Sequence, residues 1–258
     1  MPSAYAHYRM GSRVLPRLDP EIQACIRRNR HLYDLGLHGP DFLFFHRPVS
    51  QDRLYHQASF VHKSPGRVFF ENAREQLRRS PSQKGLAYVY GVLAHFAVDS
   101  LCHPFINRKA LEGIAGHTEM ESEFDRWLLE QDGKPCTYPI AGHLRIDSPA
   151  EAAQIARFYE DLDPRMVRVC FRNYRFILNF CTAPEGLRRE LIGRNAFGSL
   201  ANEFMMTTTA NLRCETLTPG IYARYRQAEE GFPALARQFQ AFLTRGTPLG
   251  PEFDRDFG

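Results

Sequence analysis

The sequence lacks the motifs that assign many enzyme classes at sight. It has no HExxH motif, which excludes the zincin proteases, and it has no GxSxG motif or phosphate-binding P-loop. It has no adjacent His-Asp dipeptide, which argues against the large HD-type phosphohydrolase class. No run of five Lys or Arg residues occurs, so the sequence does not demand a nucleic-acid partner.

Other absences bear on the cellular compartment. None of the six cysteines forms a CxxC pair, and in a cytosolic chain of this length we expect free, mostly buried thiols. The most apolar window, residues 86–96, is interrupted by Gly91 and His95. It is too short for a membrane span, which needs ~20 residues. The start of the chain lacks a basic stretch followed by a long apolar run, so we expect no signal peptide, no transmembrane segment and a cytoplasmic location.

The composition is that of an ordinary globular protein with one unusual residue type. Of 258 residues, 43% are apolar and 24% are charged, which argues against global disorder and against a fibrous protein. A single body of this size buries roughly 70–75% of the surface that its unfolded chain exposes. The net charge of +4 is mildly basic, which suits phosphates or anionic headgroups. The unusual residue is histidine, of which there are ten.

Helix signals follow one another along the chain, and no repeat or sharp change of composition divides it. Capping residues and first-turn prolines predict helices over approximately 4–15, 20–35, 65–79, 83–102, 119–131, 150–161, 164–181 and 222–244, with 183–210 helical in part. The longest of these helices is expected to stop near Pro104. The aromatic stretch 42–45 resembles a short buried strand, but no partner strands are apparent.

We therefore predict an all-α fold, a multi-helix bundle that forms one domain over residues 1–258. Its motif-bearing part is 4–125, and a helical C-terminal part covers 148–245. The Gly- and Pro-rich tail, 246–258, is expected to fray. The loop 133–144 is the best candidate for a domain boundary, but it is short.

The long helix carries three ionisable residues at regular spacing. His95, Asp99 and His103 stand at positions i, i+4 and i+8. Four residues make one helical turn plus about 40°, so the three side chains project from one side of the helix. The residues around them are mostly apolar, so the helix is expected to be largely buried. Ionisable groups on a buried helix need partners, and a metal ion supplies them best.

A second pair repeats this spacing. Fourteen residues after His103, His117 and Glu121 again form a His-x-x-x-carboxylate pair. Two such pairs joined by a short connection resemble a carboxylate-bridged site for several metal ions. Imidazoles and carboxylates without thiolate ligands suit zinc, with iron or manganese as competitors. A single pair of this kind is usually a surface or capping feature, so the metal prediction depends on the whole set.

Taken together, these motifs resemble the zinc-dependent phospholipase C family. The pattern HxxxDxxxH followed by HxxxE, preceded by Gly39-Pro40-Asp41 and by an early histidine, His7, is the ligand order of that family. The matching segments run from residue 4 to about residue 125. The resemblance implies an all-helical bundle that holds three zinc ions, a fold shared with the zinc-dependent single-strand nucleases.

The resemblance implies a role for eight residues. Asp41 matches the family aspartate that is both a ligand and the proposed general base, and Asp99 matches a ligand that bridges two zinc ions. His62 is the favoured match for the next histidine ligand, with His56 as the alternative. The other implied ligands are His7 and His95 and, at a separate three-ligand zinc, His103, His117 and Glu121.

The third zinc site is one point at which this sequence departs from the family pattern, and the lack of a recognisable secretion signal is the other. Secreted family members complete the third zinc site with the amino group and carbonyl of an N-terminal Trp. Here the chain begins Met-Pro, and its single Trp is Trp127. The resemblance therefore implies two zinc ions and leaves a third, at His7, open.

The implied function is hydrolysis of a phosphodiester by a metal-activated water, with Asp41 as general base. The expected substrate is a phospholipid, cleaved to diacylglycerol and a phosphorylated headgroup. The expected partners are this substrate and, transiently, a membrane surface, without a stable nucleic-acid partner. Two alternatives stay open, which are a nuclease or other phosphodiesterase on the same fold and a metal-binding protein without catalysis. The presence of Asp41 favours an enzyme.

Overall fold

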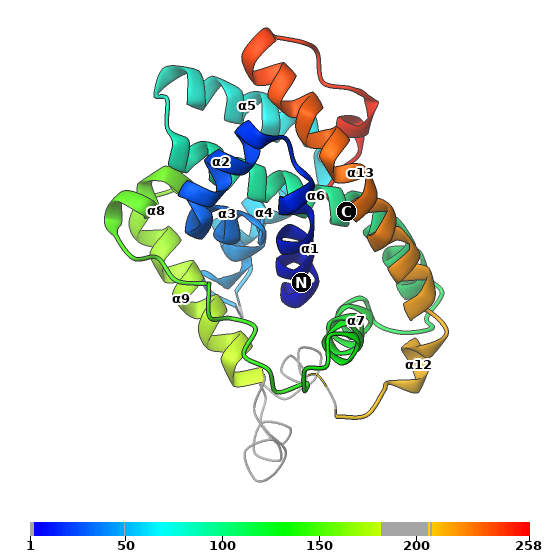
Figure 1. The fold of residues 1–258 in the computed structure, drawn as a ribbon. Coiled ribbons are helices and arrows are strands. Elements are labelled where there is room, and N and C mark those ends of the chain that lie inside the picture. The colour runs from blue at the N-terminus through cyan, green and yellow to red at the C-terminus, as the bar shows by residue number, and fades with distance from the viewer. Residues whose placement is uncertain (1–2, 49, 182–205, 207) are drawn as a thin grey trace.

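The computed structural model is all-α, which confirms the predicted fold class (Figure 1). It describes residues 3–48, 50–181, 206 and 208–258. Within these ranges no β-strand occurs, and one isolated β-bridge pairs Pro65 with Asp256. Nearly all of 183–210, which we predict to be helical in part, lies outside the described residues.

The described α-helices lie between residues 4 and 245. Those of the motif-bearing part are α1 (Ala4–Val14), α2 (Pro20–Arg28), α3 (Arg30–Gly36), α4 (Arg53–Lys63), α5 (Gly66–Arg79), α6 (Gln83–Leu111) and α7 (His117–Gln131). Those that follow are α8 (Pro149–Ala156), α9 (Pro164–Cys181), α12 (Leu212–Glu215) and α13 (Thr218–Arg245). Short 3-10 helices are η1 (Leu15–Arg17), η2 (Asp41–Phe45) and η3 (Pro251–Asp254).

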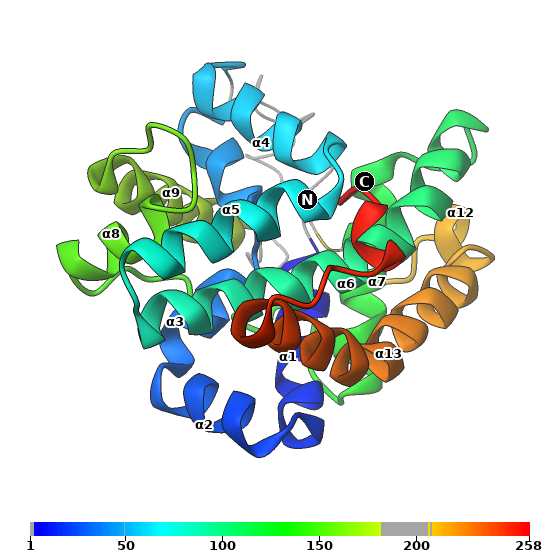
Figure 2. The same ribbon diagram turned by 90° about the horizontal axis from the view of Figure 1, so that it is seen from above.

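Helix α6 lies in the middle of the fold. Every residue from Ala87 to Ser100 is buried, and α1, α3, α5 and α13 pack around the helix (Figure 2). By length and composition α6 is apolar enough to cross a membrane, but 89% of its most apolar window is buried inside the protein. A helix that is apolar on all sides is typical of a protein core. Burial against the neighbouring helices therefore explains why α6 is apolar on all sides.

Two glycines allow α3 to cross α6 at close range. A Cβ atom on Gly36 would lie 2.1 Å from the carbonyl oxygen of Tyr88, and one on Gly91 would lie 2.2 Å from that of Tyr33. Both oxygens belong to backbone and cannot turn aside. The crossing holds the segment that follows α3 against α6. In this segment Gly39 lies directly against the ring of His95.

The predicted helix over 20–35 is two helices, because the chain leaves the helical conformation at Asn29 (φ −128°, ψ 36°). The Asn29 side-chain amide donates to the carbonyl of Cys25 at 3.0 Å. Short polar side chains compete in this way with the helical backbone. The break lets α3 turn toward α6.

Helix α6 continues past Pro104, where we predicted its end. A proline inside a helix removes a backbone hydrogen bond and crowds the preceding turn, at a cost of about 3 kcal/mol or more. Packing of the following residues compensates here. Ile106 is buried, and Phe105 lies against Gly220 of α13, where a Cβ would come within 2.7 Å of its ring. The extra turns bring Asn107 into the region of the predicted site.

Helix α4 has no counterpart among the predicted helices. Its first turn is capped by Asp52, whose Oδ1 accepts from the backbone N–H groups of Leu54 at 3.0 Å and Tyr55 at 3.1 Å. This cap is the signal that the sequence offered, since Asp is a favoured residue at a helix start. The helix matters because its last turn carries His62.

The C-terminal tail packs into the core, so the prediction that it frays is wrong. Phe253 and Phe257 are fully buried, and both rings contact Phe70 of α5. The backbone N–H groups of Phe257 and Gly258 donate to the carbonyl of His62 at 3.0 and 3.2 Å. The Gly and Pro content of the tail suggested fraying. The rings of Phe253 and Phe257 instead pack on Phe70, which is distant in the sequence, so the composition of the tail does not indicate this contact. The loop 133–144 also joins the core, through Ile140, Ala141 and Leu144.

Replacement of Gly91 by Ala tests the crossing of α3 and α6. The added methyl group meets backbone, so we expect the free energy of unfolding to fall by about 1–3 kcal/mol. Gly231 provides the matched control, because it is an exposed helical glycine with no other atom within 4 Å of its Cβ position. Gly231→Ala should stabilise by about 0.5–1 kcal/mol. Urea denaturation measures both, and equal effects of the two variants would contradict the close crossing.

Candidate metal centre

The structure brings all eight predicted ligands to one region around α6. They come from five elements, and their donor atoms form two adjoining groups. Within each group the donor atoms lie within 4.8 Å of one another. The groups are Asp41, His62, His95 and Asp99, and His103, His117 and Glu121, with His7 beside Asp99.

The first group has four donors, all buried. His62 Nε2 lies 2.9 Å from Asp41 Oδ1, and His95 Nε2 lies 2.8 Å from Asp99 Oδ2. His95 Nε2 is also 3.8 Å from Asp41 Oδ1. Two imidazoles and two carboxylates that converge in this way fit a four-coordinate zinc ion.

The second group has three donors, from α6 and α7. His103 Nε2 lies 3.2 Å from Glu121 Oε1, and His117 Nε2 lies 3.4 Å from Glu121 Oε2. Three protein donors leave one position of a tetrahedral ion for water or substrate, as in catalytic zinc sites. This group adjoins the first at Asp99, because His103 Nε2 is 3.7 Å from Asp99 Oδ1.

His7 lies against the same aspartate. Its Nε2 is 3.2 Å from Asp99 Oδ1, and its ring stacks on His95 with centroids 4.3 Å apart. Its Nδ1 is buried and has no hydrogen-bond partner in the described part of the chain. His7 and Asp99 provide two donors, which is too few for a complete third zinc site by themselves.

The other ring nitrogen of each grouped histidine has a hydrogen-bond acceptor. These Nδ1 atoms lie 2.8–3.2 Å from oxygens of neighbouring residues, which are Ala58 O for His62, Leu37 O for His95, Phe257 O for His103 and Asn107 Oδ1 for His117. Metal-ligating histidines almost always use their second nitrogen in this way.

This pattern of hydrogen bonds tests whether the donors fit a metal. A neutral ring that donates from Nδ1 presents a lone pair at Nε2, and each of these Nε2 atoms faces a carboxylate oxygen. Two acceptors are stable face to face only when a proton or a metal ion lies between them. Burying several protonated rings side by side is costly, so a metal ion is the better partner and the donor set fits zinc.

The charges around the centre prepare the carboxylates to act as ligands. Burial by itself would raise the pKa of Asp99, but His103, His95 and His7 hold this pKa well below its usual value. Burial opposes ionisation of Asp41 too, and His95 and His62 lower its pKa. Both carboxyl groups are therefore ionised at neutral pH.

His103 shows the reverse effect. Burial lowers its pKa, but Asp99 and Glu121 outweigh burial and raise the pKa to about 9. Without a bound metal, a proton would take the place of the cation between His103 and Glu121.

The structure also shows where the alternative histidine His56 and a further buried histidine, His38, lie. His62 lies in the first group, whereas its alternative, His56, is exposed on the same helix. His38 is fully buried, and its Nε2 lies 2.6 Å from His143 Nε2. Burial and His143 lower the pKa of His38 well below its usual value, so this pair is neutral.

Sequence reasoning missed the residues that position the ligands. Asp125 is fully buried and accepts from the backbone N–H groups of Tyr5 at 2.9 Å and Ala6 at 2.8 Å. Burial raises the pKa of this carboxyl to about 8. Because Asp125 holds the first turn of α1, it places His7 beside Asp99. Only the position of Asp125, four residues after Glu121 on the same helix face, signalled this role in the sequence.

A glycine allows the backbone to pass close to the centre. Gly39 has a positive φ of 40°, and a Cβ there would lie 2.3 Å from the ring of His95. The segment that leads to Asp41 can therefore lie directly against α6, which a larger residue would prevent.

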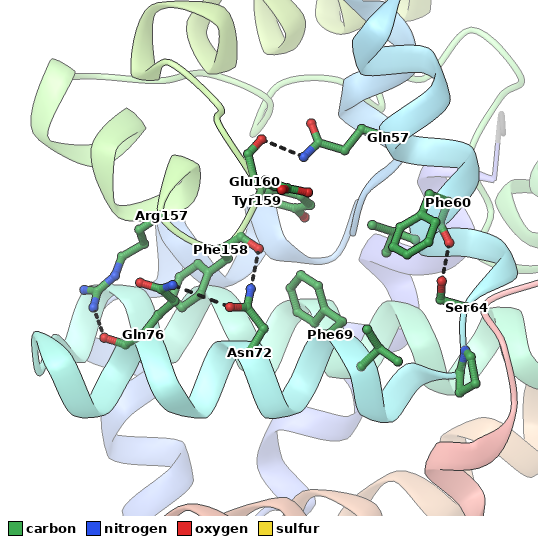
Figure 3. Close-up of a pocket in the computed structure, with 13 residues that line it drawn as sticks. Gln57, Phe60, Ser64, Phe69, Asn72, Gln76, Arg157, Phe158, Tyr159 and Glu160 are labelled. Atoms are coloured by element: carbon green, nitrogen blue, oxygen red, sulfur yellow. Dashed lines mark hydrogen bonds between the residues drawn. The ribbon is translucent and has the colours of Figure 1, made fainter.

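A groove of about 360 Å³ beside α4 and α5 is a separate feature. Phe60, Phe69 and Tyr159 line it together with polar side chains, among them Asn72, which donates to Phe158 O at 3.1 Å (Figure 3). None of the eight predicted ligands lines this groove. The chemistry of the centre therefore does not extend into it.

Comparison with known proteins agrees with the geometry. A family model described as zinc dependent phospholipase C matches residues 6–175, about two thirds of the 258 residues. The chain therefore belongs to the zinc-dependent phospholipase C family. Searches of curated proteins and of solved structures returned no significant match.

Asn107 offers a test of the second donor group. Asn107→Leu removes the acceptor of His117 Nδ1, and we expect the affinity for one zinc ion to fall about 10–100-fold. Asn107→Asp keeps an acceptor oxygen and is the matched control, with affinity near that of the wild type. Competition with a chromophoric chelator measures both affinities. Equal zinc affinity in the Leu and Asp variants would rule out a positioning role for Asn107.

The C-terminal segment can be tested in the same way. A chain that ends at Asp256 lacks the carbonyl that accepts from His103 Nδ1, so we expect its affinity for the zinc at His103 to fall about 10–100-fold. Phe257→Leu keeps this carbonyl and an apolar side chain, and should retain zinc at reduced thermal stability. Zinc content after dialysis and thermal unfolding separate the two effects. Full zinc retention by the shortened chain would contradict the role of Phe257.

Proposed function

We propose that this member of the family hydrolyses the phosphodiester bond of a phospholipid, releasing diacylglycerol and a phosphorylated headgroup. Family membership supports a zinc-dependent hydrolase that acts on phosphoric esters. The observation that carries the proposal is the pair of donor groups that meet at Asp99, with the candidate base Asp41 in one of them. A phosphodiester can bridge two adjoining metal sites through its free oxygens.

The two donor groups define where zinc would be held. Asp41, His62, His95 and Asp99 would hold one ion, and a second would be held by His103, His117 and Glu121. Bound zinc would lower the pKa of a water ligand toward about 7 and neutralise charge on the phosphate oxygens. His7 is the protein donor available for a third ion.

Asp41 has the properties of a general base. Its carboxylate is ionised at neutral pH because His95 and His62 lower its pKa against the effect of burial. Both histidines face Oδ1, and no hydrogen bond to Oδ2 occurs in the described residues. Oδ2 is therefore available to orient the attacking water and to accept its proton.

We also propose a cytoplasmic location for this activity. All six cysteines are unpaired, and five of them are buried. Chains that work in oxidising compartments usually pair such thiols, so the free thiols support this proposal.

Asp41→Asn tests the proposed base. The amide keeps one oxygen donor but cannot take up a proton at neutral pH, so we expect kcat to fall by about 10²–10⁴ while at least one zinc stays bound. Asp99→Ala should instead lose both zinc and activity, because Asp99 adjoins both groups. Hydrolysis of a short-chain phosphatidylcholine and zinc analysis of the purified protein measure these effects.

Other results would change the proposal. Fewer than one zinc per wild-type chain, with Asp99→Ala unchanged in activity and stability, would refute the metal centre. Turnover of single-stranded DNA without turnover of phospholipid would favour the nuclease alternative.

A further inference from the structure

Helix α9 presents a row of arginines to solvent. Arg165, Arg168, Arg172 and Arg175 are all exposed, and their spacing of three and four residues places them on one side of the helix. Residues 164–181 include no acidic side chain. The helix therefore carries a charge of +4, equal to the net charge of the whole chain.

These arginines line a groove of about 650 Å³ together with Arg145, which comes from the loop before α8. Arg145 pairs with Asp147 at 2.8 Å. None of the four arginines of α9 forms an ion pair with another described residue. Their positive charge is therefore available to an external anion.

Apolar side chains interrupt this basic surface. Phe176 lines the same groove and is 67% exposed, and Met166 on the same helix is 37% exposed. Basic residues clustered on a helix surface attract anionic membranes, and aromatic rings are enriched at the headgroup level of a membrane. A single-stranded nucleic acid would need a series of aromatic rings for its bases, and among the described residues that line this groove Phe176 is the one aromatic.

The opposite face of α9 is attached to the element that carries Asp41. Phe171 stacks on Phe42 of η2 with centroids 4.7 Å apart, and Tyr174 stacks on Phe45 with centroids 4.0 Å apart. Figure 1 shows α9 at the edge of the fold. A surface bound by the arginines would therefore contact a helix that packs directly on the element that carries Asp41.

We propose that the arginine surface, defined by the four arginines of α9 with Arg145 and Phe176, docks the protein on a bilayer that contains anionic phospholipids. The guanidinium groups bind lipid phosphates in forked pairs of hydrogen bonds, and Phe176 inserts among the headgroups. The biological use of this contact rests on the proposed function, since it brings the enzyme to the layer that holds its substrate. Binding itself does not depend on catalysis.

Sedimentation with vesicles tests this surface in the full-length protein. The vesicles contain phosphatidylcholine alone or with roughly one third phosphatidylglycerol, at about 0.1 M salt. We expect binding to the anionic vesicles only. Replacement of the four arginines of α9 by Gln should weaken this binding about tenfold or more, because each basic residue near the surface contributes to adsorption.

A second variant controls for net charge. Arg27, Arg28, Arg78 and Arg79 are exposed arginines on α2 and α5, and their replacement by Gln removes the same charge from other faces. This variant should bind anionic vesicles within about twofold of the wild type, since attraction beyond about 10 Å is screened at this salt concentration. Equal weakening of both variants would overturn the proposal, as would a wild type without preference for anionic vesicles. Loss of single-stranded DNA binding in the α9 variant, with unchanged vesicle binding, would also overturn it.

Turnover of a monomeric short-chain phosphatidylcholine separates this proposal from the proposed function. The α9 variant should keep wild-type turnover of this soluble substrate, because its substitutions lie outside the metal centre. Vesicle binding by a wild type without turnover would contradict only the proposed function. Wild-type turnover with vesicle binding unchanged in the α9 variant would overturn only the arginine surface.

Discussion

The ionised carboxylate of Asp99 is the constraint on which the rest of the structure depends. It lies on the central helix α6, is 3% exposed, and faces imidazole nitrogens of His95, His7 and His103 at 2.8, 3.2 and 3.7 Å. An isolated charge buried this deeply would be very costly. The surrounding histidines lower this cost, and metal ions, which the donor set fits, would lower it further. Removal of any of these partners leaves charge without compensation.

The packing of the bundle serves to bring those partners together. The glycine crossing of α3 with α6 sets the approach of the backbone before Asp41, and Leu37 in that segment accepts from His95. Asp125 on α7 fixes the start of α1. The C-terminal segment also contacts the centre. The backbone carbonyl of Phe257 accepts from His103, and the Phe257 ring contacts His62 and His95. Each of the four grouped histidine rings is thereby held by a hydrogen bond to a residue outside the two donor groups.

Local periodicity made part of the candidate metal centre predictable from the sequence. The spacing of His95, Asp99 and His103 follows from the helical repeat, and the long apolar helix around them confirmed the prediction that they are buried. The break at Asn29 and the continuation past Pro104 were not predictable in this way. In the first case a side chain competes with the helical backbone, and in the second tertiary packing outweighs a local penalty.

The sequence by itself determined the all-α class, the residue types of the metal centre and the pairs that share a helix face, because each depends on contacts within a few residues. Only the tertiary structure decided that His62 rather than His56 joins the centre. It also decided that the tail from 246 to 258 is part of the core and that Asn107, Asp125 and Phe257 position the ligands. These contacts join residues from 10 to 154 positions apart. No local pattern encodes them, since they form only when separate helices pack against α6.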